Sequence, residues 1–373
     1  MNALPKGSNV NADGGGEATA AIITGPAQRI ALAPDFAAVQ DQFERQGWTD
    51  GLPIVPPTPE LVAEMVAGSG LSADAVIAPV APSMAPLTVE KLAINAVMAG
   101  CRPLYMPVLI AALRALARPA FNLAGFQATT HPGGPLLWIN GPARGRIGLN
   151  CATNLFGPGV RANATIGRAL RLVMINIGEG IPGKNDFATQ GNPCKYSYCG
   201  GENEEQSPWP PLHTTLGYSP EESTALVLAA EGPHNINDHH SQRAPDLLTI
   251  IADTMNVIGA NTFYLGNEAM LILSPEHAGL LARAGMRRED VRDELCARLR
   301  VDLARVPEAV LARMARIRKS LATPAPDNTV GWFEDPAQLL IAVAGGPGLH
   351  SVFIPGFGIS SMQIERIEPL EQS

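Results

Sequence analysis

Three of the seven histidines of this chain lie within seven residues, at 234–240. The apolar run at 225–230 precedes them and predicts a strand that is covered on both faces. Ligands of α/β proteins bind in loops beyond strand ends. Imidazole and carboxylate groups suit zinc, manganese or iron, so we expect His234, Asp238 and His239 to bind a divalent metal. The alternative is a turn in which Asn and Asp side chains hydrogen-bond to the backbone.

Histidine also titrates near neutrality, which suits it to acid–base catalysis. His131 in the polar loop A-T-T-H-P-G-G-P, His234, and His350 after the turn at 345–348 are the candidates. That turn lacks both G-x-x-x-x-G-K-[ST] and G-x-G-x-x-G, so we expect no nucleotide cofactor. A small polar or carboxylate-bearing substrate fits better. We expect four polar residues to bind it: Arg144, Asn163, Asn235 and Ser351.

The long polar stretch at 181–212 indicates a second, thiol-based chemistry. Cys199 precedes two glycines, whose backbone amides would lower its pKa and stabilise a nearby anion. Lys195 would assist, whereas Glu202 and the neighbouring glutamates would oppose thiolate formation. Cys199, Lys195 and Glu202 are further catalytic candidates in this stretch. The alternative for Cys199 is a buried structural thiol.

Four apolar runs each end in a small residue and a proline: W-I-N-G-P, A-A-E-G-P, L-I-L-S-P and V-A-G-G-P. A histidine follows three of them closely, and Arg144 follows the first. The pattern predicts parallel strands whose ends converge on one edge of a sheet. Such an edge would bring His234, His239, His350 and Arg144 into one site.

The composition excludes several classes of protein. The chain has 373 residues, of which 46% are hydrophobic and 17% charged, and its net charge is −8. An acidic chain without a basic run is unsuited to nucleic acid or to an anionic membrane. No apolar run approaches the roughly 18 residues that span a bilayer. Five cysteines, an odd number, argue against a disulfide scaffold. We expect a cytoplasmic protein with a small-molecule substrate, and homo-oligomer formation stays open.

Helix signals are clearest in the first half of the chain. Thr58 before Pro59 and Thr88 before an apolar segment are N-cap residues, and Gly100 is a C-terminal stop. Residues 164–177 have helical periodicity that places Arg168 and Arg171 on the polar face.

The fold class follows from buried strands that alternate with helices. We expect an α/β protein with a mixed, partly parallel sheet, helices on both faces and two interlocked lobes. Residues 1–33 would form a flexible N-terminal arm, 34–135 a helix-rich lobe and 136–373 an α/β lobe with the histidine loops.

Several stretches resemble a group of bacterial proteins of this length: W-T-D-G-L-P-I-V-P-P-T, A-I-N-A-V-M-A-G-C-R-P, Q-A-T-T-H-P, F-G-P-G-V-R-A-N-A-T-I-G-R-A, E-N-E-E-Q-S-P-W and E-G-P-H-N-I-N-D-H. The D-G-L-P opening is similar to that of bacterial (seleno)proteins named after a U-G-S-C motif. The resemblance covers most of residues 40–360 and implies no particular reaction. No U-G-S-C or C-G-S-C tetrapeptide is present here, so no redox function follows from it.

The leading hypothesis is an enzyme that acts on a small polar or carboxylate-bearing substrate by hydrolysis or lyase chemistry. Its centre would be a His/Asp metal site or an acid–base site. One alternative is a nucleophilic or redox enzyme centred on Cys199. Another is a protein that binds a metal or small ligand without turnover.

Overall fold

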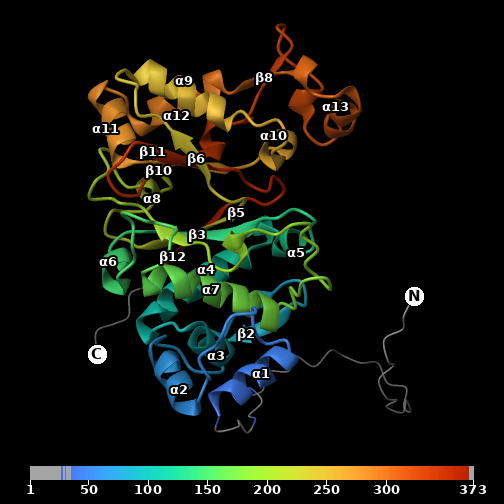
Figure 1. Ribbon diagram of the computed structural model, residues 1–373, viewed down its shortest axis with the longest axis vertical. Coiled ribbons are helices and arrows are strands. Elements are labelled where there is room, and N and C mark those ends of the chain that lie inside the picture. Colours follow the sequence, from blue (N-terminus) through green and yellow to red (C-terminus); the bar gives the residue numbers. More distant parts are fainter. Residues whose placement is uncertain (1–26, 28–29, 31–34, 369–373) are drawn as a thin grey trace.

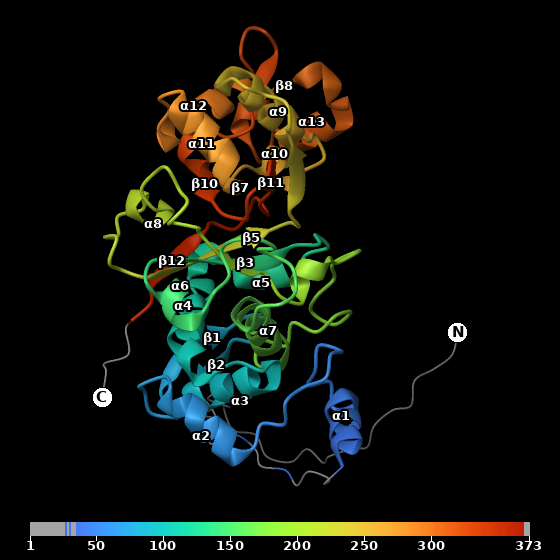
Figure 2. The ribbon, with the colours of Figure 1, turned by 60° about the vertical axis from the view of Figure 1, so that its left-hand side comes forward.

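The computed structural model describes Ala27, Ile30 and residues 35–368. Two central sheets lie between helices, and the helices of residues 36–99 form a further layer beyond those that contact the first sheet (Figure 1 and Figure 2). Two four-stranded sheets are stacked in the middle, and helices cover the outer face of each. The α/β class is therefore confirmed, with two mixed sheets in place of the single sheet expected. The predicted arm at 1–33 lies outside the described residues, except for Ala27 and Ile30.

The first sheet has the order β12-β5-β3-β4, in which only β3 and β4 are parallel. Its strands are β3 (Gly134–Asn140), β4 (Cys199–Gly201), β5 (Thr224–Ala230) and β12 (Gln363–Arg366). Every residue of β3 and β5 is buried, because helices cover one face and the other sheet covers the opposite face. This two-sided burial explains the uninterrupted apolar sequence of both strands.

The helices of the first half lie below this sheet in Figure 1. The elements in this half are α1 (Phe36–Arg45), α2 (Pro59–Ala67), α3 (Val89–Ala99), α4 (Met106–Leu116), α5 (Leu123–Gln127), α6 (Ala143–Ile147), α7 (Arg161–Asn176) and the hairpin of β1 (Val76–Val80) with β2 (Ala85–Thr88). Thr58, Thr88 and Gly100 cap α2 and α3 as the sequence predicts.

The second sheet has the order β10-β7-β11-β6, in which only β10 and β7 are parallel. Its strands are β6 (His234–Asn237), β7 (Ala269–Leu273), β10 (Leu339–Val343) and β11 (His350–Ile354). The remaining elements are α8 (Leu212–Thr215), α9 (Ala244–Met255), α10 (Asn261–Leu265), α11 (Pro275–Arg283), α12 (Arg288–Arg298), α13 (Glu308–Met314) and the hairpin of β8 (Arg300–Asp302) with β9 (Thr329–Gly331). The predicted histidine loop is wrong for residues 234–237, which form the edge strand β6 paired with β11, whereas Asp238, His239 and His240 lie outside any strand.

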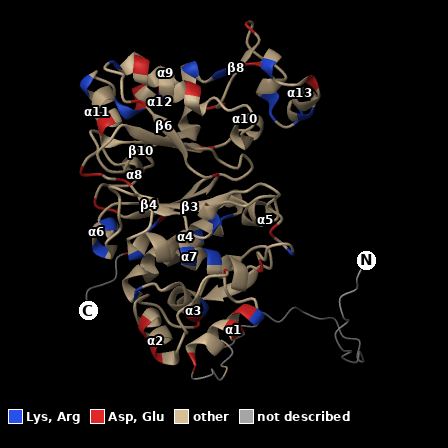
Figure 3. Ribbon diagram, in the orientation of Figure 1, with Lys and Arg blue, Asp and Glu red and all other residues tan. Residues whose placement is uncertain are grey.

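The two sheets pack face to face through apolar side chains. Trp138 and Leu226 of the first sheet lie in one buried cluster with Met270 and Leu340 of the second. Separate cores lie between each sheet and its own helices. Figure 3 shows few charged residues on the sheets and many on the outer helices. The interior of the molecule is thus a double sheet, and its charged groups lie mainly outside it.

The second sheet and its helices form an insertion between two neighbouring strands of the first. β5 and β12 are antiparallel neighbours, with Val227 opposite Gln363, and the inserted part follows β5 and ends before β12. Ala230 and Gly356 form a bridge where the insertion begins and ends. The predicted lobe boundary at 135/136 differs from this arrangement. The core places β3, β4 and β5 with the N-terminal helices, because their outer faces pack on α4 and α7.

No one helix of the described chain has both the length and the apolar content to span a membrane. The segments Pro103–Leu116 and Pro119–Gln127 reach that length only as a pair, with a 72° bend between them. The α4 part of this pair belongs to the core below the first sheet.

Candidate functional site

A group of polar side chains gathers where β3 begins and β5 ends. It draws on the loop before β3, on α7, on the irregular segment before β4 and on the residue that follows β5. We call these residues the polar cluster: Gln127, His131, Arg171, Asp186, Cys194, Lys195, Tyr198 and Glu231. Two of them, His131 and Lys195, were candidates from the sequence.

His131 and Glu231 form the first pair of the polar cluster. The amide of Gly133 donates to His131 Nδ1 at 3.2 Å, so the imidazole proton is on Nε2 and is donated to Glu231 Oε1 at 3.0 Å. The imidazole also packs against Phe357, with ring centroids 5.0 Å apart. Both ring nitrogens of His131 are therefore engaged. The side chain of Glu231 remains 28% exposed, and its second oxygen has no partner among the described residues.

Lys195, Asp186 and Arg171 form the second group. Lys195 Nζ lies 2.6 Å from Asp186 Oδ2, and Arg171 Nη1 lies 3.9 Å from the same oxygen. Arg171 also donates to the Lys195 carbonyl at 2.7 Å and to Gln127 Oε1 at 3.4 Å. Arg171, which the sequence places on the polar face of its helix, is buried. Burial lowers the pKa of Lys195 and of Arg171, and Asp186 opposes that effect.

Backbone contacts hold these two groups beside each other. The amide of Thr189 donates to the Thr130 carbonyl at 2.9 Å, and the Asn192 side chain donates to the Pro132 carbonyl. A Cβ at Gly134 would lie 2.9 Å from the Cys194 carbonyl oxygen, so only glycine fits there. The segment that carries Asp186 and Lys195 is thus fixed along the loop that carries His131.

The thiols are protonated at neutral pH. Cys199 lies in β4 and is buried, and burial raises its pKa. Burial likewise raises the pKa of Cys194 to about 11 and that of Cys101 to about 12. The Tyr198 hydroxyl, which donates to the Glu231 carbonyl at 3.1 Å, and Cys194 also interact with each other. These surroundings disfavour the thiolate that a nucleophile or redox centre at Cys199 requires.

Glu202 lies away from the polar cluster and ties the two sheets together. Its side chain is fully buried, and Arg288 of α12 donates to it at 2.8 Å. Asn140 and the amides of Leu212 and Val343 also donate to it. Burial raises its pKa and lowers that of Arg288, because removal from water disfavours both charges. The geometry is that of a structural ion pair with no access for a substrate.

Three of the predicted substrate-binding residues are engaged within the protein. Arg144 donates to both oxygens of Glu205 and to the Glu202 carbonyl. Asn163 makes a reciprocal pair of bonds with the backbone of residue 150. The Ser351 hydroxyl bonds to His277 Nδ1 at 2.8 Å. Each of these side chains holds a loop or strand end in place.

The histidines after β5 separate onto two faces of the second sheet. His234 pairs with Phe353 and His350 with Asn237 in antiparallel register. Because successive side chains alternate, His234 lies on the Phe353 face, whereas His350 lies on the opposite face. His350 Nε2 is 3.1 Å from His239 Nε2, and its Nδ1 is 3.1 Å from the Asn235 side-chain oxygen.

The predicted metal ligands are not grouped together. The Asp238 carboxylate accepts bonds from the amides of His240 and Ser241, which is the turn that the sequence offered as the alternative. Among the described residues, no three His, Cys, Asp or Glu side chains are arranged to hold a metal ion. Metal binding by His234, Asp238 and His239 stays a prediction.

The predicted convergence of strand ends on one edge is wrong. β3 and β5 are antiparallel neighbours, so the segments that follow them leave from opposite ends of the first sheet. Arg144 follows β3, and His234 follows β5. β7 and β10, the parallel pair, belong to the other sheet.

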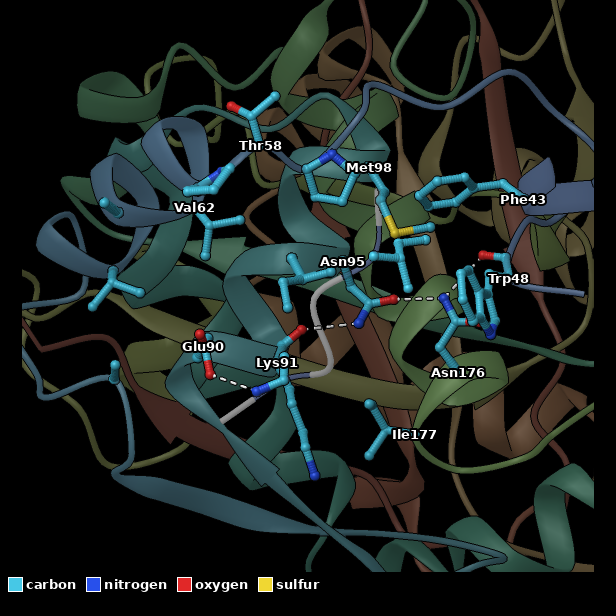
Figure 4. A pocket seen from close by; sticks show the side chains of 18 of the residues that line it. Phe43, Trp48, Thr58, Val62, Glu90, Lys91, Asn95, Met98, Asn176 and Ile177 are labelled. Carbon is cyan, nitrogen blue, oxygen red and sulfur yellow. Dashed lines mark hydrogen bonds between the residues drawn. The ribbon is translucent and has the colours of Figure 1, made fainter. Parts of the chain in front are cut away.

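A cavity of about 990 Å³ lies between α1, α2, α3 and the C-terminal end of α7 (Figure 4). Phe43, Trp48, Val62 and Met98 give it a largely apolar lining. Asn176 donates to the Asn95 side-chain oxygen at 2.8 Å within it. The cavity thus offers an apolar volume with a small polar group, which is typical of sites for small molecules.

The D-G-L-P stretch is a structural clamp in this chain. Asp50 accepts two hydrogen bonds from Arg168, at 2.8 and 2.9 Å, and Arg168 also donates to the carbonyls of Leu52 and Pro53. A bidentate pair of this kind fixes the loop against α7. The D-G-L-P stretch therefore fixes the segment between α1 and α2 against α7.

No protein-family model, curated protein or solved structure matches the chain in the comparisons made. The resemblance of the D-G-L-P stretch to the selenoprotein group stays a prediction. The function is therefore inferred from the geometry of the polar cluster and of the cavity.

Sequence reasoning missed Glu231, Asp186, Arg171 and Tyr198. One signal for Glu231 was present, since A-A-E-G-P places a charged residue directly after a fully apolar strand. Strand ends are where α/β proteins keep functional side chains. Asp186 and Tyr198 come from an irregular segment whose path no periodicity indicates.

Replacing Glu202 with Ala is expected to destabilise the protein by about 3–5 kcal/mol, because it leaves the Arg288 charge buried and unpaired. Urea unfolding followed by circular dichroism measures this change. Glu294→Ala, which removes an exposed ion pair on the same helix, is the control and should cost less than about 1 kcal/mol. Equal effects of the two changes would contradict a structural role for Glu202.

The folded protein should react slowly with iodoacetamide at neutral pH. A rise in the Cys194 pKa from 9.0 to about 11 lowers its thiolate fraction, and hence its labelling rate, about 100-fold. Mass spectrometry of labelled peptides measures the rate for each cysteine, with protein unfolded in guanidinium as the control. Rapid labelling of Cys199 in the folded protein would show that its burial does not protect it.

Proposed function

We propose that this protein is an enzyme that transfers protons to and from a small polar or carboxylate-bearing substrate, in a hydrolase or lyase reaction. The polar cluster is its active site. Glu231 is the catalytic acid and base, and His131 is the positioning residue that holds it. The observation that carries the proposal is the geometry of Glu231, whose one oxygen is held at 3.0 Å by His131 while the side chain stays partly exposed.

The group of Lys195, Arg171 and Asp186 favours a substrate carboxylate. Glu231 supplies the negative charge that makes the polar cluster as a whole neutral. Lys195 and Arg171 are both cations, and the Asp186 carboxylate is the one anion that lies between them. The group therefore keeps one uncompensated positive charge. Lys195 is the more accessible of the two cations, so its ammonium group is suited to contact a substrate carboxylate.

The hydrogen bond from His131 gives Glu231 a fixed direction. With Oε1 held, Oε2 is the oxygen that accepts a proton from an attacking water in hydrolysis or from a carbon acid in elimination. The same oxygen returns the proton to the leaving group. The five cysteines are all unpaired, which agrees with a reducing compartment. We therefore propose the cytoplasm as the location of the enzyme.

A panel of small carboxylic esters, amides and hydroxy acids, followed by proton NMR, tests this proposal. Glu231→Gln is expected to lower kcat about 100-fold or more against any substrate that the wild-type protein converts, because the amide accepts no proton. Glu221→Gln changes an exposed glutamate at the opposite end of β5 and should leave turnover unchanged. Full activity of Glu231→Gln would overturn the assignment.

The cavity supports a second function, the binding of a largely apolar small molecule without turnover. Its volume of about 990 Å³ and its apolar lining with the Asn95–Asn176 pair favour this function. It shares no lining residue with the polar cluster. The two functions can therefore be tested separately.

Anilinonaphthalene sulfonate, an apolar fluorescent probe, is expected to bind in the cavity and to change the fluorescence of Trp48. Ala63→Phe should weaken this binding about tenfold, because the new ring fills part of the cavity. Ala309→Phe places the same ring on an exposed helical position of α13 and is the control. Equal probe binding by all three proteins would show that the probe binds elsewhere.

A further inference from the structure

Two exposed imidazoles meet at the edge of the second sheet. His350 begins β11, and His239 lies just beyond the end of β6, the strand that pairs with β11. Their Nε2 atoms are 3.1 Å apart, and their ring planes are inclined by 73°. The main chain brings them together, because the antiparallel register places His350 opposite Asn237, two residues before His239. This pair lies outside both the polar cluster and the cavity.

The hydrogen bonds of His350 leave a lone pair on its Nε2 atom, which faces His239. Its Nδ1 donates to the Asn235 side-chain oxygen at 3.1 Å, so the Nε2 atom that faces His239 carries no proton. The proton between the two rings therefore comes from His239. A metal ion in the place of this proton would receive a lone pair from each imidazole, with the His239 proton moved to its Nδ1.

The separation of the two nitrogens suits a transition metal. Two nitrogens at about 2.05 Å from zinc and 3.1 Å from each other subtend about 98° at the metal. That angle lies between the right angle of an octahedral site and the larger angle of a tetrahedral one. The bond from Nδ1 to Asn235 is also typical of metal-binding histidines, which donate their other nitrogen to a fixed acceptor.

The surroundings favour a cation. Asp238 directly precedes His239, and its carboxylate is fixed by the amides of His240 and Ser241. Its second oxygen is buried and has no hydrogen-bond partner in the described part of the chain. The turn that contains His239 thus carries a negative charge. It also lies beside His277, whose Nε2 contacts the Asp238 carbonyl.

We infer that His239 and His350 form a two-histidine site for a divalent transition metal such as zinc, with Asn235 as the residue that orients His350. Water completes the coordination. The site differs from the ligand set that sequence spacing suggests, because His350 comes from a different strand and His234 lies on the other face of the sheet. It is independent of the acid–base chemistry proposed for Glu231.

Titration calorimetry with Zn²⁺ on protein without an affinity tag tests the inference. The wild-type chain is expected to bind one zinc ion, and His239→Ala or His350→Ala should weaken that binding about tenfold or more. His240→Ala and His234→Ala remove neighbouring exposed imidazoles and should leave the affinity unchanged. Circular dichroism confirms that each variant is folded. Absence of zinc binding by the wild-type chain, or equal binding by the His239→Ala/His350→Ala double variant, overturns the site.

Changes at Asn235 separate metal binding from a merely structural pair. Asn235→Ala removes the acceptor of His350 Nδ1–H and is expected to weaken zinc binding about tenfold. Asn235→Asp supplies a charged acceptor, which makes the imidazole a stronger ligand, and should tighten zinc binding. Equal zinc affinity in both variants would contradict the assigned orienting role.

Discussion

A carboxylate without access to solvent joins the two halves of this molecule. Glu202 accepts hydrogen bonds from Arg288 and Val343 of the inserted part and from Asn140 and Leu212 of the first part. An ion pair in such a place tolerates little displacement, because a buried charge without its partner costs several kcal/mol. Apolar packing between the sheets is non-directional, so it does not select one alignment by itself. The buried pair supplies that selection.

The sequence predicts individual elements better than their assembly. Thr58 and Thr88 mark helix starts through chemistry that acts within one turn, and the structure confirms both. The apolar runs of β3 and β5 correctly indicate burial on both faces. They do not show what covers each face. A second sheet and a helix layer leave the same apolar pattern, so the two-sheet arrangement and its insertion could not be predicted.

The candidate site shows the same limit. His131 could be named from its polar loop before two glycines, and Lys195 from its place near Cys199. Their partners Glu231 and Asp186 are distant in sequence and meet them only through tertiary contacts. Glu202 lies in the same polar stretch as Lys195, yet its side chain forms an internal ion pair with Arg288. Polarity in a loop predicts that a side chain has a partner, and only the fold tells which partner it is.

The insertion between β5 and β12 has a consequence for how the chain is made. A ribosome releases β5 long before β12, so the edge of β5 stays unpaired until the entire inserted part has emerged. During that interval Glu202 also lacks Arg288, the cation that it needs inside the protein. The N-terminal half therefore cannot complete its sheet or its buried ion pair before the inserted part has been made. Completion of the fold is coupled to the arrival of the last strand, which makes the C-terminal segment the final step of assembly rather than an appendage.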